Sequence, residues 1–346
     1  MYGFSRHAVA TTVVGCVVVA LAACTPGGTD PVASDTPEAT AAPEVTAKVQ
    51  PGDCLAEQIP NANGNLDADL TSVTDCGGES RYLVYAVADI AAEFLPAEGA
   101  SEEDILAQRE SITLATGEAY ANFHLAARKV CSAEFVSQAG LDGVDVVGAS
   151  PADVLAEPSG NFYTDVTASS EAEWLAGEFY FVCSLGWETV DKLPTTAVIG
   201  SSTLTDFFSA EWPSELRRCT QWVGDGVENV LADCQEPHWM EHTVQLDPWA
   251  VLGEDARVAF DVESPDEDLW LELDTFCEPF TAPYLGEGAD PESYWSTALW
   301  VNFDQDKVPT SLVCGVSVED SENLDVLGTL AGLGDGAPIT LEVAAQ

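Results

Sequence analysis

The tetrapeptide VTDC at residues 73–76 has a counterpart, LADC, at residues 231–234, and each is followed by an apolar, β-prone run, at 82–87 and at 243–246. These stretches belong to two sets of four cysteines: Cys54, Cys76, Cys131 and Cys183, then Cys219, Cys234, Cys277 and Cys314. The first four are separated by 22, 55 and 52 positions and the last four by 15, 43 and 37. Because both sets run short, long, long in matching contexts, we expect a tandem duplication.

Helix-like and strand-like patterns recur at equivalent places in the two halves. Apolar residues at i, i+3 and i+4 steps predict a helix around Cys131 and another around Cys277. Strand-like runs at 179–182 and 311–313 lead into Cys183 and Cys314. We therefore expect an α+β fold in which each half has a small, mainly antiparallel sheet and one principal helix.

The chain is long enough for two domains. The expected boundaries place a first domain at 51–205, a second at 213–335 and a C-terminal tail at 336–346, with a linker around 203–213 between the domains.

An even set of cysteines in an oxidising compartment indicates disulfides. Eight cysteines permit 105 pairings, and spacing alone leaves the alternatives open. A short loop closed between neighbouring strands, and a helix tied to the last strand, would each add roughly 2–4 kcal/mol. The pairs expected on this basis are Cys54–Cys76, Cys131–Cys183, Cys219–Cys234 and Cys277–Cys314.

The N-terminus is typical of an exported protein. Residues 1–23 combine Arg6 with an apolar run that is short for a membrane span. The run ends in LAAC at residues 21–24, which resembles the lipobox of bacterial lipoproteins, although an ordinary signal peptide is the alternative. The resemblance implies that Cys24 carries the lipid and that 24–50, rich in Thr, Pro and Ala, is a disordered tether. The predicted location is the outer face of the cytoplasmic membrane.

Charge excludes some classes of partner. The chain has 59 Asp and Glu against 11 Lys and Arg, a net charge of -48. Binding a phosphate backbone requires clustered basic residues, so nucleic acid is not an expected partner. Docking on anionic lipid headgroups is disfavoured for the same reason, which leaves the lipid anchor as the predicted membrane contact.

One motif points to a family. The second half carries Cys-x-x-Pro-His-x-x-Glu at Cys234, Pro237, His238 and Glu241, and the first half carries GDCL at 52–55. These residues resemble the septum-formation family of exported actinobacterial domains, although the first half lacks the Pro and His after its second cysteine. The resemblance implies a non-enzymatic surface lipoprotein that acts as an interaction or scaffold module, with an envelope protein or the cell wall as partner.

The same motif contains a second pattern, His-x-x-Glu-His at 238–242, which is typical of zinc proteases when both histidines lie on one helical face. Pro237 precedes it and a β-prone run follows, so a helix is not expected here. We predict instead a hydrogen bond between His238 and Glu241. No catalytic residue, metal ligand or cofactor is predicted, and a metal-dependent envelope hydrolase is a remote alternative.

Tryptophans suggest another alternative, because exposed rings can stack on sugars or peptides. Trp295 and Trp300, in the loop-like stretch 291–304, are expected to be the most exposed. A ligand-binding lipoprotein that takes a cell-wall fragment, a cation or a small solute through its second half is therefore the alternative function. A concave pocket lined by Trp295 and Trp300, with a few convergent polar groups, would favour this function, whereas a flat exposed apolar patch without a pocket would favour a protein partner.

Overall fold

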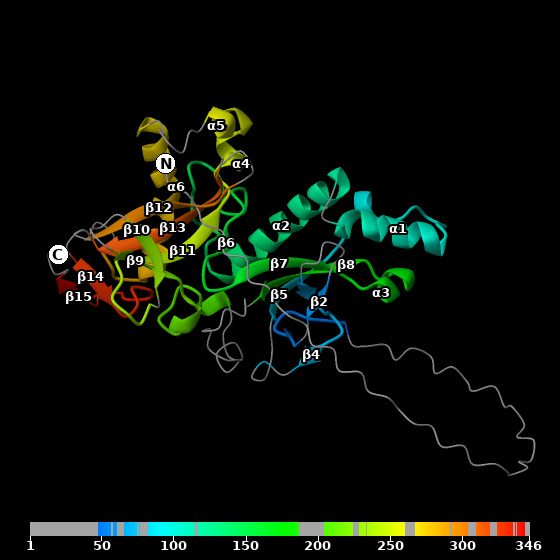
Figure 1. Cartoon of the computed structure of the whole chain (residues 1–346), viewed down its shortest axis with the longest axis horizontal. Coiled ribbons are helices and arrows are strands. Elements are labelled where there is room, and N and C mark those ends of the chain that lie inside the picture. The colour runs from blue at the N-terminus through cyan, green and yellow to red at the C-terminus, as the bar shows by residue number, and fades with distance from the viewer. Residues whose placement is uncertain are drawn as a thin grey trace, which may run out of the picture. The chain divides into compact units, whose positions relative to one another are not determined.

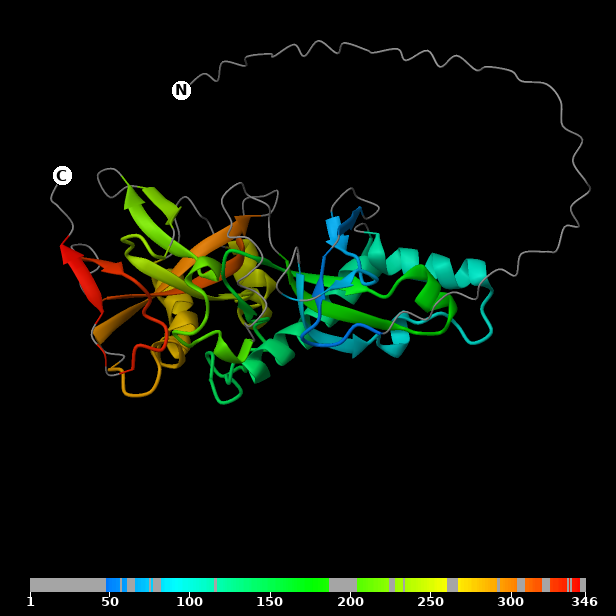
Figure 2. The same ribbon diagram turned by 90° about the horizontal axis from the view of Figure 1, so that it is seen from below.

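Two antiparallel sheets form the framework of the protein in the computed structural model (Figures 1 and 2). The structure describes residues 48–56, 58–60, 66–74, 76, 82–114, 117–186, 204–223, 228–232, 234–259, 267–290, 293–303, 309–318, 324–334, 336 and 338–342. This mixture of helices and antiparallel sheets confirms the predicted α+β class.

The first sheet has five strands in the order β4-β1-β5-β8-β7. Its strands are β1 (Cys54–Leu55), β4 (Val73–Thr74), β5 (Tyr82–Asp89), β7 (Tyr163–Ala168) and β8 (Tyr180–Gly186). A small hairpin of β2 (Gln58–Pro60) and β3 (Leu66–Ala68) lies between β1 and β4 in the sequence. The helices of this half are η1 (Ala92–Phe94), α1 (Glu102–Thr113), α2 (Glu118–Gln138) and α3 (Glu171–Leu175).

The second sheet follows the order β10-β9-β11-β13-β12. Its strands are β9 (Cys219–Val223), β10 (Glu228–Ala232), β11 (Met240–Leu246), β12 (Tyr294–Phe303) and β13 (Pro309–Val318). The helices of this half are η3 (Leu204–Asp206), η4 (Ser214–Leu216), α4 (Trp249–Leu252), α5 (Glu254–Ala259) and α6 (Glu267–Leu285). A hairpin of β14 (Leu324–Leu327) and β15 (Ile339–Glu342) ends the described chain.

The two sheets share one strand order when their strands are taken in sequence. Counted along the chain, the strands of each sheet lie side by side in the order second, first, third, fifth, fourth. β1 and β9 are therefore second from one edge, and β8 and β13 are second from the other. In each half a long helix, α2 or α6, packs on the sheet. This likeness supports the expected duplication, which stays a prediction together with its domain boundaries.

Four disulfides connect the elements in the same way in both halves. In each half, the cysteine on β1 or β9 is bonded to the cysteine that follows the neighbouring edge strand, β4 or β10. The cysteine on the long helix, α2 or α6, is bonded to the cysteine on β8 or β13. The pairs are Cys54–Cys76, Cys131–Cys183, Cys219–Cys234 and Cys277–Cys314, with Cα–Cα distances between 5.0 and 5.6 Å. These are the four pairs that were expected from the sequence.

The stretch expected to be a linker is packed into the core. Leu204, Phe207 and Trp212 are at most 2% exposed, and they belong to one hydrophobic cluster that includes Phe135 of α2 and Phe280 of α6. Two short 3-10 turns, η3 and η4, lie in and just after this segment. The described part of Thr46–Gln346 therefore forms a single compact unit.

A short strand from the first half also completes the second sheet. β6 (Glu157–Pro158) pairs antiparallel with β11, through Val244 with Pro158 and Gln245 with Glu157. The Glu157 carboxylate is 5% exposed and accepts a hydrogen bond from Arg128 Nε of α2 at 2.8 Å. Although burial opposes the charged form, Glu157 raises the pKa of Arg128. This ion pair fastens β6 to α2.

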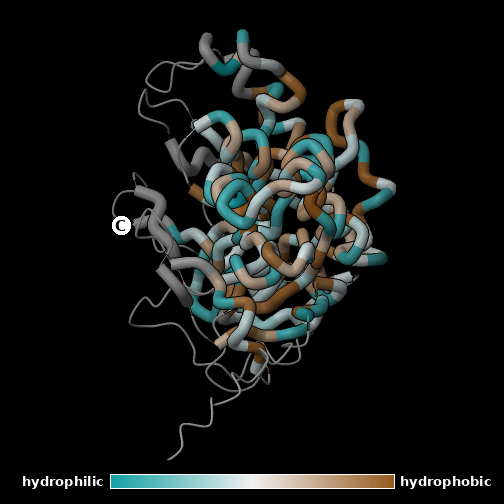
Figure 3. The backbone as a smooth tube through the Cα atoms, turned by 90° about the vertical axis from the view of Figure 1, so that its right-hand side faces the viewer, coloured by the Kyte–Doolittle hydropathy of each residue, from teal (hydrophilic) through white to brown (hydrophobic). Residues whose placement is uncertain are grey.

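Hydrophobic and hydrophilic stretches alternate along the chain trace (Figure 3), as expected where short elements each bury one face. Within the described residues, none of the helices is both long and apolar enough to span a bilayer. The predicted signal peptide and tether, 1–50, fall almost entirely outside those residues.

Candidate functional site

The Pro-His-Glu motif lies at the start of β11, where its histidine and glutamate are both fully buried. His238 Nε2 is 3.2 Å from Glu241 Oε1, and His238 Nδ1 is 2.8 Å from the carbonyl oxygen of Glu236. The predicted hydrogen bond between His238 and Glu241 is therefore confirmed. The backbone of His238 also exchanges two hydrogen bonds with Val326 of β14, so the motif holds the C-terminal hairpin.

The Glu241 carboxylate is the centre of a buried polar network. It accepts hydrogen bonds from the Tyr284 hydroxyl at 2.6 Å, the Thr329 hydroxyl at 3.0 Å and the Leu330 amide at 2.7 Å. The Arg217 guanidinium, 3% exposed, donates to the Tyr284 hydroxyl at 3.1 Å. Burial, followed by the charge of Glu241, raises the pKa of Tyr284, which keeps its hydroxyl a donor. All members of the network except the partly buried Thr329 are buried, so the network links β11, α6 and the segment after β14 inside the protein.

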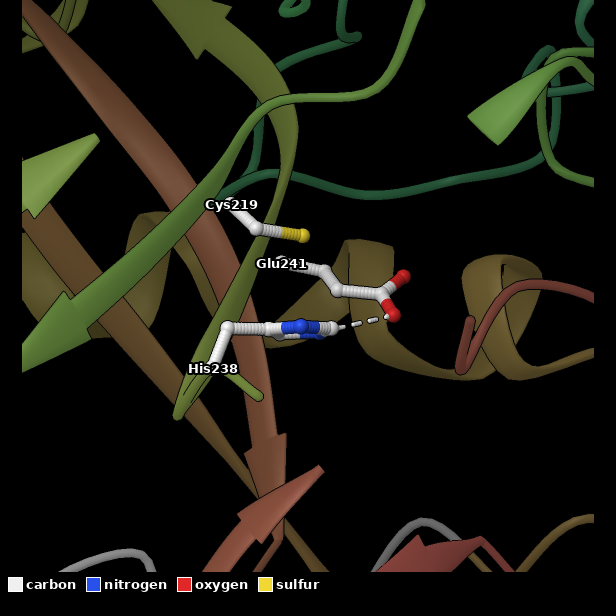
Figure 4. Close-up of side chains that lie close together, drawn as sticks. All are labelled: Cys219, His238 and Glu241. Atoms are coloured by element: carbon white, nitrogen blue, oxygen red, sulfur yellow. Dashed lines mark hydrogen bonds and ion pairs between the residues drawn. The ribbon is translucent and has the colours of Figure 1, made fainter. Parts of the chain in front are cut away.

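Cys219, His238 and Glu241 bring their ligand atoms within 4.8 Å of one another (Figure 4). Zinc would require a thiolate at this cysteine, but Cys219 is bonded to Cys234. The histidine and glutamate are hydrogen-bonded to each other. The cluster as it stands is a disulfide beside a hydrogen-bonded histidine and glutamate, and it offers only two ligands.

His242, the second histidine of the His-x-x-Glu-His pattern, lies within β11, so the helical face required by zinc proteases is not formed. His242 Nε2 is 2.7 Å from the Thr220 hydroxyl. Burial, with a smaller contribution from Arg218, lowers the pKa of His242 to about 3. This histidine is a neutral core residue.

The predicted tryptophan face lies on a strand and not in a loop. Residues 294–303 form strand β12 and not a loop, because this β-prone stretch pairs along its length with β13. Trp295 is 47% exposed, as expected. The side chain of Trp300 and the lipidation residue Cys24 lie outside the described residues.

A cleft of about 700 Å³ lies where α2, the loop before β6, the end of β11, α4, α5 and the start of β13 meet. Apolar side chains form much of its wall, among them Leu125 of α2, Leu155 of the loop and Trp249 of α4. Trp249 is 7% exposed and Leu155 1% exposed. The volume is within the range of small-molecule sites, and the sequence patterns did not point to it.

Charged side chains also line this cleft: Lys129 and Arg257, with Asp153 and Asp247. The Asp153 carboxylate accepts hydrogen bonds from the amide and hydroxyl of Ser150 at 3.1 and 2.7 Å, and these bonds lower its pKa. Asp247 accepts from the Trp249 amide at 3.1 Å, and its pKa is raised chiefly by burial. Both carboxylates thus have local structural partners.

Backbone strain is present in the wall of the same cleft. Leu155 has a φ of 50°, in the left-handed region that costs a non-glycine residue roughly 1–2 kcal/mol. Hydrogen bonds on either side hold the conformation: the Asp247 amide donates to the Val154 carbonyl at 2.8 Å, and the Ser132 hydroxyl donates to the Ala156 carbonyl at 2.8 Å. Strained residues of this kind cluster at ligand sites.

Comparison with known proteins found no matching protein-family model, no similar curated protein and no similar solved structure. The resemblance to the septum-formation family therefore rests on the motif residues alone.

Proposed function

We propose that this chain is a non-enzymatic, lipid-anchored binding protein of the cell envelope that holds a small ligand in the cleft between α2 and α4. The observation that carries the proposal is the cleft itself, which combines an apolar wall with convergent polar groups. The cleft favours the ligand-binding alternative inferred from the sequence over the scaffold function. It is a different site from the predicted tryptophan face.

Two further observations support this function. The residues of the catalytic-looking motif, His238 and Glu241, are fully buried and do not line the cleft, so they are not placed to act on a molecule held there. The four disulfides fit an oxidising compartment outside the cytoplasm. Cys24 is the proposed anchor: Cys24→Ser should release the exported chain from membranes, and retention of the variant in the membrane fraction would refute the anchor.

A variant with a filled cleft tests the function. Ala250 lines the cleft on α4 and is exposed, so Ala250→Trp should occupy ligand volume with little effect on the core. The next residue, Val251, is 38% exposed and does not line the cleft, which makes Val251→Trp a matched control.

The measurement is native mass spectrometry of the chain exported by the cells that express it. We expect a small-molecule adduct on the wild type and on Val251→Trp, and its loss on Ala250→Trp. An adduct that persists on Ala250→Trp would place the ligand elsewhere and contradict the proposal.

An interaction module of the septum-formation type is the second candidate, favoured by one observation. Trp295 is half exposed on β12, and among the described strands β12 pairs only with β13. A photo-reactive amino acid at position 295 should crosslink an envelope protein in growing cells if this candidate is right, and the absence of a specific crosslink would count against it.

A further inference from the structure

We infer that the ligand of the cleft carries an anionic group, a carboxylate, phosphate or sulfonate, attached to an apolar body. The inference rests on the proposed function, and it follows from the charged side chains that line the cleft: both carboxylates are held by local hydrogen bonds, and Lys129 makes no ion pair among the described residues.

Basic side chains are scarce in this protein, yet two of them line one cleft. The chain has 59 acidic and 11 basic residues, whereas the cleft has two of each, Lys129 and Arg257 beside Asp153 and Asp247. The local balance of charge is therefore far more positive than that of the chain. An anion would be repelled by most of the surface, whereas the balanced charges of this cleft would oppose it far less within a Debye length of about 8–10 Å in ordinary salt.

The carboxylates of the cleft are engaged in shaping it. Asp153 is hydrogen-bonded to Ser150, and Asp247 accepts the amide of Trp249 at the start of α4. For Lys129, by contrast, no carboxylate of the described residues lies within ion-pair distance. A lysine without an ion pair, in a chain with about five carboxylates for each base, is a group available to a ligand anion.

The second cation approaches from another element. Lys129 lies on α2 and Arg257 on α5, so the two charges reach the cleft from opposite parts of the sequence. Arg257 also acts on Asp247, whose pKa it helps to lower against the effect of burial. Trp249 and Leu155 line the same cleft with apolar atoms, which suits the body of an amphiphilic anion.

A pair of dyes separates the anionic group from the apolar body. 8-Anilinonaphthalene-1-sulfonate carries both, and N-phenyl-1-naphthylamine has the same ring system without the sulfonate. Both would be titrated by fluorescence into the full exported chain carrying Cys24→Ser, which avoids lipid and detergent. The variants are Lys129→Met, Arg257→Met and the filled-cleft Ala250→Trp.

We expect Lys129→Met and Arg257→Met each to weaken binding of the sulfonate dye about 1.5- to fivefold, the scale of one partly exposed charge pair, and to leave the neutral dye unchanged. Lys48→Met is the charge-matched control, because Lys48 lies outside the cleft over the Tyr180 ring, and it should affect neither dye.

Two outcomes would overturn different claims. Equal binding of the two dyes, lost in Ala250→Trp but insensitive to Lys129→Met and Arg257→Met, would refute the anionic class and leave the binding function standing. Failure of both dyes to bind, or binding that Ala250→Trp does not weaken, would count against the cleft as a site and hence against the proposed function.

Discussion

Replacing Glu241 by glutamine should destabilise the protein strongly, because this side chain is fully buried and accepts four hydrogen bonds. Glutamine keeps the volume but removes the charge that faces His238 and, through Tyr284, the buried Arg217. It also replaces one acceptor oxygen with a donor group opposite the hydroxyls of Tyr284 and Thr329. The perturbation is therefore electrostatic and leaves packing nearly unchanged.

The magnitude follows from these contacts. A hydrogen bond to a charged group contributes about 1.5–3 kcal/mol and a neutral one about 0.5–1.5, so weakening four bonds by about 1 kcal/mol each gives about 4 kcal/mol. This is a large fraction of a typical stability of about 5–15 kcal/mol.

Urea unfolding with the disulfides intact measures the effect. With a slope of about 3 kcal/mol per molar, the midpoint should fall by at least about 1 M. Glu272→Gln on the exposed side of α6 is the control and should change stability by less than about 0.5 kcal/mol. Hydrogen exchange at the Leu330 amide, which donates to Glu241, should also accelerate. A midpoint for Glu241→Gln equal to that of the control would refute the structural role of the network.

Two further predictions concern stability. Because burial lowers the pKa of His242 to about 3 from the ordinary 6.5, the unfolded state binds a proton that the folded state does not. The contribution of neutral His242 to stability is therefore complete above pH 6.5 and is lost as the pH falls toward 3. His242→Gln should show a shallower loss of stability between pH 6.5 and 4, and an unchanged dependence of stability on pH, measured by urea unfolding, would contradict this. Val147 has a φ of 54° and is 44% exposed, so Val147→Gly should relieve left-handed strain and raise stability by about 0.5–1 kcal/mol. Val130→Gly on α2 should lower the melting temperature, and a decrease for both variants would refute the strain argument.

Local patterns in the sequence predicted much of the fold. The helical periodicity around Cys131 and Cys277 corresponds to α2 and α6, and the strand-like runs correspond to β5, β8, β11 and β13. These patterns succeed because periods of 2 and 3.6 depend on near neighbours in the chain. The prediction was wrong at 294–303, which was expected to be loop-like and forms a strand because it pairs with β13.

Two further local signals in the sequence, both helix-capping motifs, correspond to helices of the first half. Ser101 with Asp104 forms a capping box at α1, and Ser170 with Glu173 forms one at α3. These signals are local and would have added α1 and α3 to the single principal helix that was expected for the first half.

By itself, the sequence determined the α+β class, the positions of the principal helices and strands, the likeness of the two cysteine sets, and the hydrogen bond between His238 and Glu241. Each of these depends on residues close in sequence or on matching spacings. Only the tertiary structure decided that β6 joins the second sheet and that Lys129 and Arg257 line one cleft with Trp249. The physical reason is that these groups are brought together by the packing of one hydrophobic core across both halves, and such packing leaves no periodic trace in either segment alone.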